Sequence, residues 1–192
     1  MFKKILLSSV LTATLFSSAH AASINFNSGE RSSKPVSLEF PGKVYDSANT
    51  LSAIEKRAAK SDATPSEEFL LAYVEVNKSK DKEAILDMWT SEERAEIGQM
   101  MSDPEALRAN SAFFSNIVAS NLMATMQYRG YELLYVSHKL QGSSTRISQV
   151  YAASKAKDGK LYASNGLADD FYYSRLSDVM AEYLAKEVLK LK

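Results

Sequence analysis

The sequence predicts an α+β fold in which helices come first, a curved antiparallel sheet of three or four strands follows, and a C-terminal helix ends the chain. Three observations carry this prediction. Apolar residues recur at helical spacing as far as residue 122, and the period then falls to about two. All four prolines lie before residue 105, whereas eight of the ten tyrosines lie after residue 127. A final stretch, from about 174 to 190, returns to helical spacing.

The first 21 residues have the pattern of a secretory signal. Lys3 and Lys4 precede a short apolar stretch from Ile5 to Phe16, and Ala19-His20-Ala21 is typical of a cleavage site. We therefore expect a mature chain that starts near Ala22 and is periplasmic, with secretion as the alternative. No later segment is apolar for long enough to predict a transmembrane anchor.

The remaining chain is short enough for one domain. Residues 22–34 are rich in Ser and Asn and predict a flexible lead-in, so that a single α+β domain covers 35–192. Alternation from Val36 to Phe40 predicts a short strand that Pro41-Gly42 ends. A weak helix is expected over about 48–60.

Stronger helix signals follow. Thr64-Pro65-Ser66-Glu67 has the pattern of a capping box with proline at the first helical position, and it opens a helix to about Asn77. A short second helix ends near Trp89. Residues 90–93 (TSEE) resemble another capping box and open a third helix to about Met101. Asp103-Pro104 begins a long fourth helix that we expect to reach Leu122.

The second half predicts a β meander with strands at about 126–140, 145–155 and 160–167. Gly142-Ser143 marks one turn, and Asp158-Gly159 is a strong signal for a two-residue hairpin. These turns pair His138 with Ile147, Leu134 with Tyr151, Lys155 with Tyr162 and Ala153 with Ser164.

Both faces of the predicted sheet carry large apolar groups. A sheet that is apolar on both sides must be covered on both sides. We expect the helices to cover one face, and the C-terminal helix, a second subunit in a homodimer or a ligand to cover the other. The first face is predicted to hold Leu134, Val136, His138, Ile147, Gln149, Tyr151 and Tyr162, and the second Tyr131, Leu133, Tyr135, Val150, Leu161 and Leu167.

Residues 64–97 (TPSEEFLLAYVEVNKSKDKEAILDMWTSEERAEI) resemble the opening of NTF2-like, or SnoaL-like, domains, and the resemblance extends over about 64–165. It implies a cone formed by helices and a curved sheet, with Trp89 near the mouth of its pocket. The family contains isomerases, cyclases, dehydratases and many non-catalytic binding or assembly modules. The long helix at 104–122 and the C-terminal helix depart from the family pattern.

Composition excludes several classes of function. The chain has 23 basic and 23 acidic residues and no cysteine. A near-neutral balance argues against nucleic acid as the partner, and the absence of cysteine excludes disulfides and cysteine-ligated metals. The sequence contains neither Gly-x-x-x-x-Gly-Lys nor Gly-x-Gly-x-x-Gly, the two glycine-rich motifs that bind nucleotide phosphates. We therefore expect no cofactor and no metal site.

His138 is the only histidine after residue 21 and is the weak candidate for a catalytic base. Glu132 and Asp170 are candidate partners for it. The alternative is a partly buried, hydrogen-bonded strand histidine. Asp169-Asp170 could likewise form a cation or acid/base site, but an Asp that begins the final helix is the favoured interpretation.

An aromatic set predicts ligand or partner binding, because tyrosine combines a flat apolar ring with a hydroxyl. We expect an exported, non-catalytic binding or protein-interaction module whose partner is an apolar small molecule or another exported protein. The alternatives are a small NTF2-like enzyme that uses His138 for acid/base chemistry on an apolar substrate, and an immunity-type protein that protects against a toxin. The binding set is Trp89, Tyr128, Tyr131, Tyr135, His138, Tyr151 and Tyr162.

Overall fold

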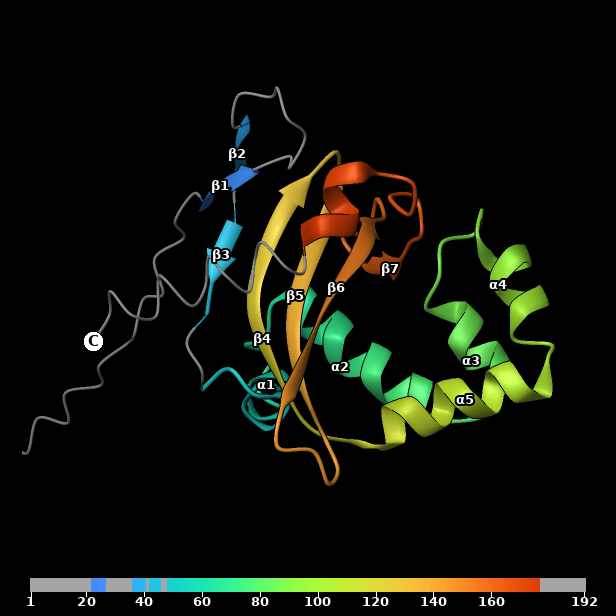
Figure 1. Ribbon diagram of the computed structural model, residues 1–192. Coiled ribbons are helices and arrows are strands. Elements are labelled where there is room, and N and C mark those ends of the chain that lie inside the picture. The colour runs from blue at the N-terminus through green and yellow to red at the C-terminus, as the bar shows by residue number, and fades with distance from the viewer. Residues whose placement is uncertain (1–21, 27–35, 41, 46–47, 177–192) are drawn as a thin grey trace, which may run out of the picture.

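The computed structural model describes residues 22–26, 36–40, 42–45 and 48–176 (Figure 1). The predicted secretory signal lies outside these residues. So does most of the predicted C-terminal helix, although its first turns are present as helical residues 171–176.

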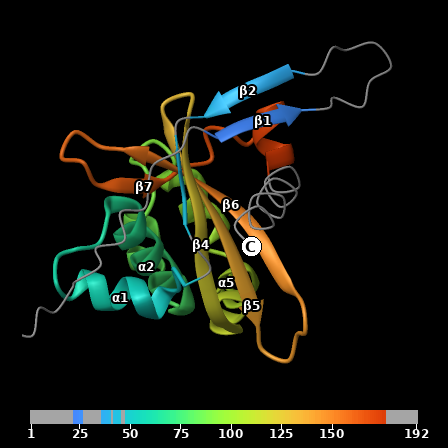
Figure 2. The ribbon, with the colours of Figure 1, turned by 90° about the vertical axis from the view of Figure 1, so that its left-hand side faces the viewer.

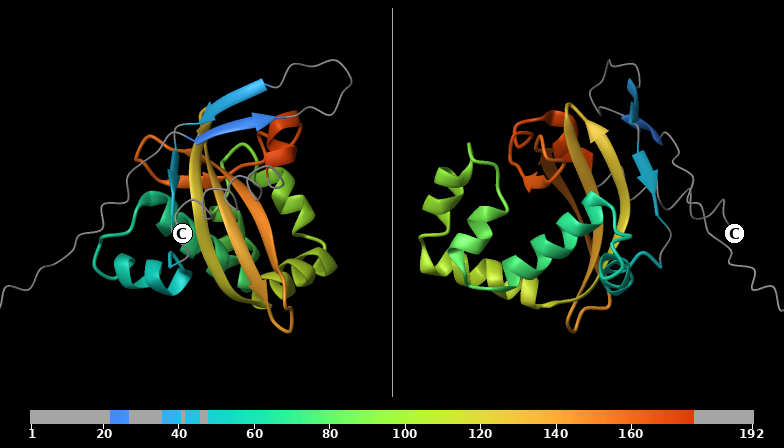
Figure 3. Two further views of the ribbon diagram at one scale, coloured as in Figure 1. Left: turned by 60° about the vertical axis from the view of Figure 1, so that its left-hand side comes forward. Right: turned by 180° about the vertical axis from the view of Figure 1, so that it is seen from behind.

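The predicted α+β class is confirmed. Within the described residues, the helices that precede the long strands are α1 (Leu51–Ala58), α2 (Pro65–Lys78), α3 (Lys82–Asp87), α4 (Arg94–Met100) and α5 (Pro104–Ser115). A five-stranded antiparallel sheet has the order β3 (Gly42–Val44), β4 (Ile117–Tyr128), β5 (Tyr131–Leu140), β6 (Arg146–Lys155) and β7 (Leu161–Ala163). The helices α2 to α5 all lie to one side of this sheet (Figures 1 and 3).

A separate two-stranded ribbon precedes the sheet. Strand β1 (Ala22–Phe26) pairs with β2 (Val36–Phe40), and Figure 2 shows this ribbon near one end of the larger sheet. The strand at Val36–Phe40 is where alternation predicts it. Strand β1 lies within the predicted lead-in, where Ile24 and Phe26 alternate with polar residues as a strand requires.

The capping box at the start of α2 is confirmed. Thr64 Oγ1 accepts a hydrogen bond from the backbone N–H of Glu67, and the Glu67 carboxylate accepts one from the Thr64 N–H. The box predicted at 90–93 is not formed. The Glu93 carboxylate accepts hydrogen bonds from the Thr90 hydroxyl at 2.7 Å, from Ser164 Oγ at 2.9 Å and from the Asn165 N–H at 2.7 Å, and none of these is a helix-cap bond. Glu93 therefore ties the helices to the chain after β7.

The predicted fourth helix was wrong in its length. It ends at Ser115, and residues 117–122 belong to β4. Val118 and Leu122 fit helical spacing, but the ladder between β4 and β5 pairs Leu122 with Val136 and outweighs that local signal. The prediction of one strand at 126–140 was also wrong, because these residues are divided between β4 and β5. The two strands are separated by the turn Arg129-Gly130, whose positive φ angles of 50° and 85° suit a two-residue hairpin.

The predicted pairing of β5 with β6 is confirmed, because His138 pairs with Ile147 and Leu134 with Tyr151. The predicted pairing of β6 with β7 was wrong by one residue: Lys155 pairs with Leu161, and Ala153 with Ala163. The loop between them has three residues rather than two, since the Ala156 N–H bonds to the Lys160 carbonyl and Gly159 takes φ +89°.

One residue of slip reverses the faces of a strand. Leu161 therefore packs with the helices, on the face opposite to the predicted one. Strand β4 also changes faces along its length, because its register shifts between Leu122 and Ala124. Leu122 packs under the helices, whereas Ala124 and Met126 pack on the second face.

The sheet separates two apolar clusters. The helix-side cluster joins α1 to α5 with the sheet and includes Leu134, Val136 and Phe114. The second cluster includes Leu133, Tyr135 and Leu176, and it brings the start of the C-terminal helix onto the other face. Within the described ranges, no helix is long and apolar enough to cross a membrane.

Candidate functional site

His138 lies on β5 in the helix-side core with no exposed surface. Its Nδ1 lies 2.6 Å from Ser120 Oγ, and its Nε2 lies 2.8 Å from the Tyr151 hydroxyl. The Tyr151 hydroxyl in turn donates to Gln149 Oε1. Both ring nitrogens therefore have a partner inside the protein. Sequence reasoning missed Ser120 because it placed that residue in a helix.

Burial, together with the positive charge of Arg146, lowers the pKa of His138 to about 4. The imidazole is therefore neutral at pH 7. The two predicted carboxylate partners bond elsewhere. Glu132 accepts a hydrogen bond from Ser66 Oγ at 2.8 Å and another from Gln127. The geometry matches the alternative interpretation, a hydrogen-bonded core histidine.

Asp170 begins the helical residues 171–176, as the favoured interpretation of Asp169-Asp170 predicted. Its Oδ1 accepts the backbone N–H groups of Tyr172 and Tyr173, each at 2.9 Å. Arg129 lies 2.8 Å from Oδ2. Burial would raise the pKa of Asp170, but these hydrogen bonds, the Tyr128 hydroxyl and the Arg129 charge together lower it.

The described part of the chain holds no group of three or more His, Cys, Asp or Glu residues placed to hold a metal ion.

The predicted aromatic set does not form one site, because the sheet divides most of it, although Trp89 and Tyr162 line one hollow at the β7 edge. Trp89, His138 and Tyr151 belong to the helix side. The second face carries the other members on the meander: Tyr128, Tyr131 and Tyr135 contact the second cluster, and the ladder places Tyr162 in the row of Ser154 and Tyr131.

Aromatic rings fill the space between α2, α5 and the sheet. The ring centroid of Tyr73 lies 5.2 Å from that of Tyr151 and 5.8 Å from that of Phe114. Burial raises the pKa of both Tyr73 and Tyr151 above the usual tyrosine value. These hydroxyls therefore stay protonated at neutral pH.

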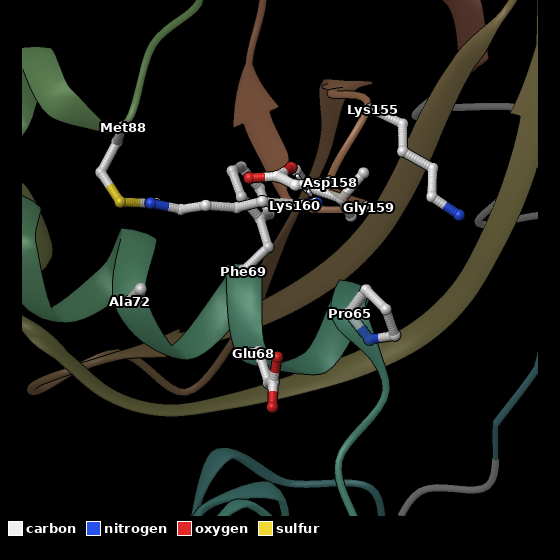
Figure 4. Close-up of a pocket in the computed structure, with 10 residues that line it drawn as sticks. Pro65, Glu68, Phe69, Ala72, Met88, Lys155, Asp158, Gly159 and Lys160 are labelled. Carbon is white, nitrogen blue, oxygen red and sulfur yellow. Dashed lines mark hydrogen bonds between the residues drawn. The ribbon is translucent and has the colours of Figure 1, made fainter.

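A groove of about 510 Å³ opens between α2 and the β6–β7 hairpin, and we call it the α2–β7 groove (Figure 4). Phe69, Met88 and Leu161 give it an apolar floor, and each of them is less than a tenth exposed. The full lining is Pro65, Glu68, Phe69, Ala72, Met88, Lys155, Asp158, Gly159, Lys160 and Leu161.

The hairpin side of the groove is basic. Lys155 and Lys160 are both exposed on it. Asp158 offsets them in part, but one of its oxygens accepts the backbone N–H of Lys160 at 2.9 Å. Figure 4 shows the Lys160 side chain extending across the groove toward Met88, whereas Glu68, which also lines the groove, points away from Lys160.

Sequence reasoning missed this groove. Its walls come from α2 and from a hairpin some ninety residues later, and neither segment carries a motif that indicates the other. The available signal was the three lysines at 155, 157 and 160, which surround the Asp158-Gly159 turn on one hairpin.

Trp89 lies beside a second hollow of about 500 Å³, with Arg94, Lys157 and Tyr162 also in its lining. The Trp89 Nε1–H is buried, and among the described residues it has no hydrogen-bond partner. Arg94 bonds to the Trp89 carbonyl and lies 3.2 Å from Asp87.

Comparison of the chain with protein-family models, with curated proteins and with solved structures gave no significant match.

Proposed function

We propose that this protein is an exported, periplasmic, non-catalytic binding module that holds a partner in the α2–β7 groove. One observation carries the proposal: an apolar floor made by Phe69, Met88 and Leu161 opens to the surface between α2 and the β6–β7 hairpin. Ligand sites are concave, mostly apolar and largely preformed, with a few polar groups at their edges.

The acid/base alternative has less support. A general base must come within hydrogen-bond reach of the proton that it removes. His138 is fully buried, and Ser120 and Tyr151 occupy its two nitrogens. The immunity-type alternative is a special case of partner binding, in which the partner would be a toxin.

An NTF2-like origin fits the helices-first order and the five-stranded antiparallel sheet. With such an origin, the proposed binding site lies outside the interior of the cone. Tyr73, Phe114 and Tyr151 fill the region where such a pocket is expected. The α2–β7 groove lies instead at the edge of the sheet.

Native mass spectrometry of the mature chain isolated from its own periplasm tests the proposal when a groove variant is compared. Ala72 is exposed in the groove, so Ala72→Trp should fill it without disturbing the core. Glu55→Trp adds the same ring to exposed α1 and is the matched control. We expect a bound mass on the unmodified chain and on Glu55→Trp, and its loss from Ala72→Trp. An equal bound mass on all three proteins would contradict the proposal.

A further inference from the structure

The outer edge of β7 is partly paired by the chain itself. The Ala163 N–H donates to the Met88 carbonyl at 2.7 Å, and the Thr90 N–H donates to the Ala163 carbonyl at 3.2 Å. These two bonds form a parallel bridge between Trp89 and Ala163. The segment 88–90 thus begins a sixth strand beside β7.

This sixth strand stops after one bridge. Before Met88 the chain turns back into α3, so it does not continue along β7. Successive residues of a strand direct their backbone groups to alternate edges. Lys160 and Ser164 bond inward to β6, and Ala163 bonds outward. The N–H and C=O of Leu161 therefore face outward, in line with those of Ala163.

In the part of the chain that the structure covers, no group hydrogen-bonds to the Leu161 N–H or C=O. Leu161 is only 4% exposed, and it lines the α2–β7 groove together with Met88. Backbone groups at a buried position are nearly always paired, and leaving them unpaired is costly. The backbone N–H and C=O of Leu161 are thus a donor and an acceptor on the outer edge of β7, where an added strand would pair with them.

We propose that the α2–β7 groove binds an extended polypeptide segment of a partner protein as an added strand on β7. The main chain of the segment pairs with the N–H and C=O of Leu161, and an apolar side chain enters between Phe69 and Met88. This inference rests on the proposed function and names the chemical class of its partner. Strand addition at a sheet edge is an established mode of peptide recognition.

Charge gives the segment a further property. Lys155, Lys157 and Lys160 surround the hairpin loop, and Asp158 is the one acidic residue between them. An acidic residue at the end of the segment that lies near this loop would complement the excess positive charge. The partner segment is therefore apolar at alternate positions and acidic at the hairpin end.

An apolar small molecule fits these observations less well. It would cover Phe69 and Met88 but would leave the two backbone groups of Leu161 without partners. An extended main chain supplies both an acceptor and a donor at the required spacing.

The test is a displayed library of random seven-residue peptides, selected on the full mature chain and counter-selected on Ala72→Trp. The selected peptide is then resynthesised with one backbone N-methyl group at each position in turn. We expect methylation at the position facing Leu161 to weaken binding about tenfold or more, because one hydrogen bond is lost and the methyl group prevents close approach. Methylation at the neighbouring positions, whose N–H groups point away, should change the affinity less than threefold.

The possible outcomes separate this inference from the proposed function. Peptides that need the open groove but respond equally to methylation at every position would leave the groove as a binding site and overturn strand addition. Failure to select any peptide that distinguishes the mature chain from Ala72→Trp would also overturn it. In that case, a small apolar mass on the periplasmic protein that Ala72→Trp loses would still support the groove, and its absence would count against both.

A matched pair of variants tests the charge. Lys155→Glu lies at the groove, and Lys78→Glu lies at the far end of α2. We expect Lys155→Glu to weaken the selected peptide about fivefold and Lys78→Glu to leave its affinity unchanged. Equal effects from both variants would contradict the predicted acidic end.

Discussion

The two faces of the sheet are held in different ways. On the helix side, side chains from α1 to α5 interlock with the sheet, and the polar groups of His138, Ser120 and Tyr151 bond to one another inside the core. On the second face, residues 171–176 bring Tyr172, Tyr173 and Leu176 against a smaller cluster. Asp170 bonds to Arg129 and Tyr128 at the β4–β5 turn, and the Tyr173 hydroxyl donates to the Val150 carbonyl on β6 at 2.9 Å.

This difference indicates how stability is distributed. Many side-chain contacts together stabilise the packing of the helices on the sheet, so the loss of one leaves the others in place. The lost side chain nevertheless leaves a cavity, which the surrounding helices cannot close. Among the described residues, the second-face cover is held by few polar contacts, chiefly those of Asp170 and the hydrogen bond from the Tyr173 hydroxyl to the Val150 carbonyl, so removal of the carboxylate should loosen that cover locally. The same sheet thus combines a cooperative core with a cover that opens independently.

The largest expected effect comes from two neighbouring leucines that have no exposed surface and lie on opposite faces. We expect Leu134→Ala, on the helix side, to lower the free energy of unfolding by about 3–5 kcal/mol. Leu133→Ala, on the second face, should cost about 2–3 kcal/mol because the cover there can relax into the cavity. Urea unfolding measures both. A larger loss for Leu133→Ala would reverse the comparison.

The second-largest expected effect is a loss of stability of the helix side in acid. The pKa of His138 is about 4 in the folded protein and near 6.5 in an unfolded chain, so the unfolded state binds the proton more readily. The contribution of neutral His138 to the free energy of unfolding is complete above pH 6.5, falls as the pH decreases, and is lost below about pH 4. We expect a decrease of roughly 3 kcal/mol across that range. His138→Gln should remove this part of the pH dependence, and an unchanged slope would contradict the assignment.

The second face should respond to Asp170. Replacing it with Ala removes the acceptor of two backbone N–H groups and the partner of Arg129. We expect local opening of residues 171–176 to become easier by about 1–2 kcal/mol. Hydrogen exchange at the Tyr172 and Tyr173 amides measures this change, and helix-side amides should not follow. Asp170→Asn keeps an oxygen that can accept hydrogen bonds from these amides, so its exchange rates should lie between those of the unmodified protein and of Asp170→Ala.

The smallest effect tests a cap on the helix side. Thr64→Ala removes the side-chain half of the α2 capping box while the Glu67 carboxylate remains. We expect about 1 kcal/mol less stability, seen as a shift of the whole unfolding transition. The shift should be global because α2 is part of the cooperative core. A local change confined to residues 64–67 would show that α2 frays independently.

Local signals predicted the elements that local interactions determine. The start of α2 follows from Thr64 and Glu67. The register of β5 on β6 follows from a turn close to both strands, which pairs His138 with Ile147. In each case the deciding residues lie within about ten positions of one another.

Tertiary interactions decided the rest. Val118 and Leu122 are four residues apart, a spacing that suits helix or strand, and only pairing with β5 selects the strand. The register shift beside Leu122 has no sequence signature, so the faces of β4 could not be predicted. A three-residue loop in place of two turned Leu161 toward the helices. The same loop places Leu161 in the lining of the α2–β7 groove. Because Leu161 was predicted on the other face, the predicted binding site did not include this groove.

The strand order of the sheet has a consequence for the folding kinetics. Strands β4 to β7 pair in chain order through short turns, whereas β3 pairs with β4 only after a loop of more than seventy residues that contains α1 to α5. Local pairings form faster because less chain entropy is lost on closure. The meander should therefore form early and offer the surface on which the helices assemble, and β3 should dock late. Gly42 makes that last step possible, since a Cβ at this position would collide with the Thr125 carbonyl oxygen.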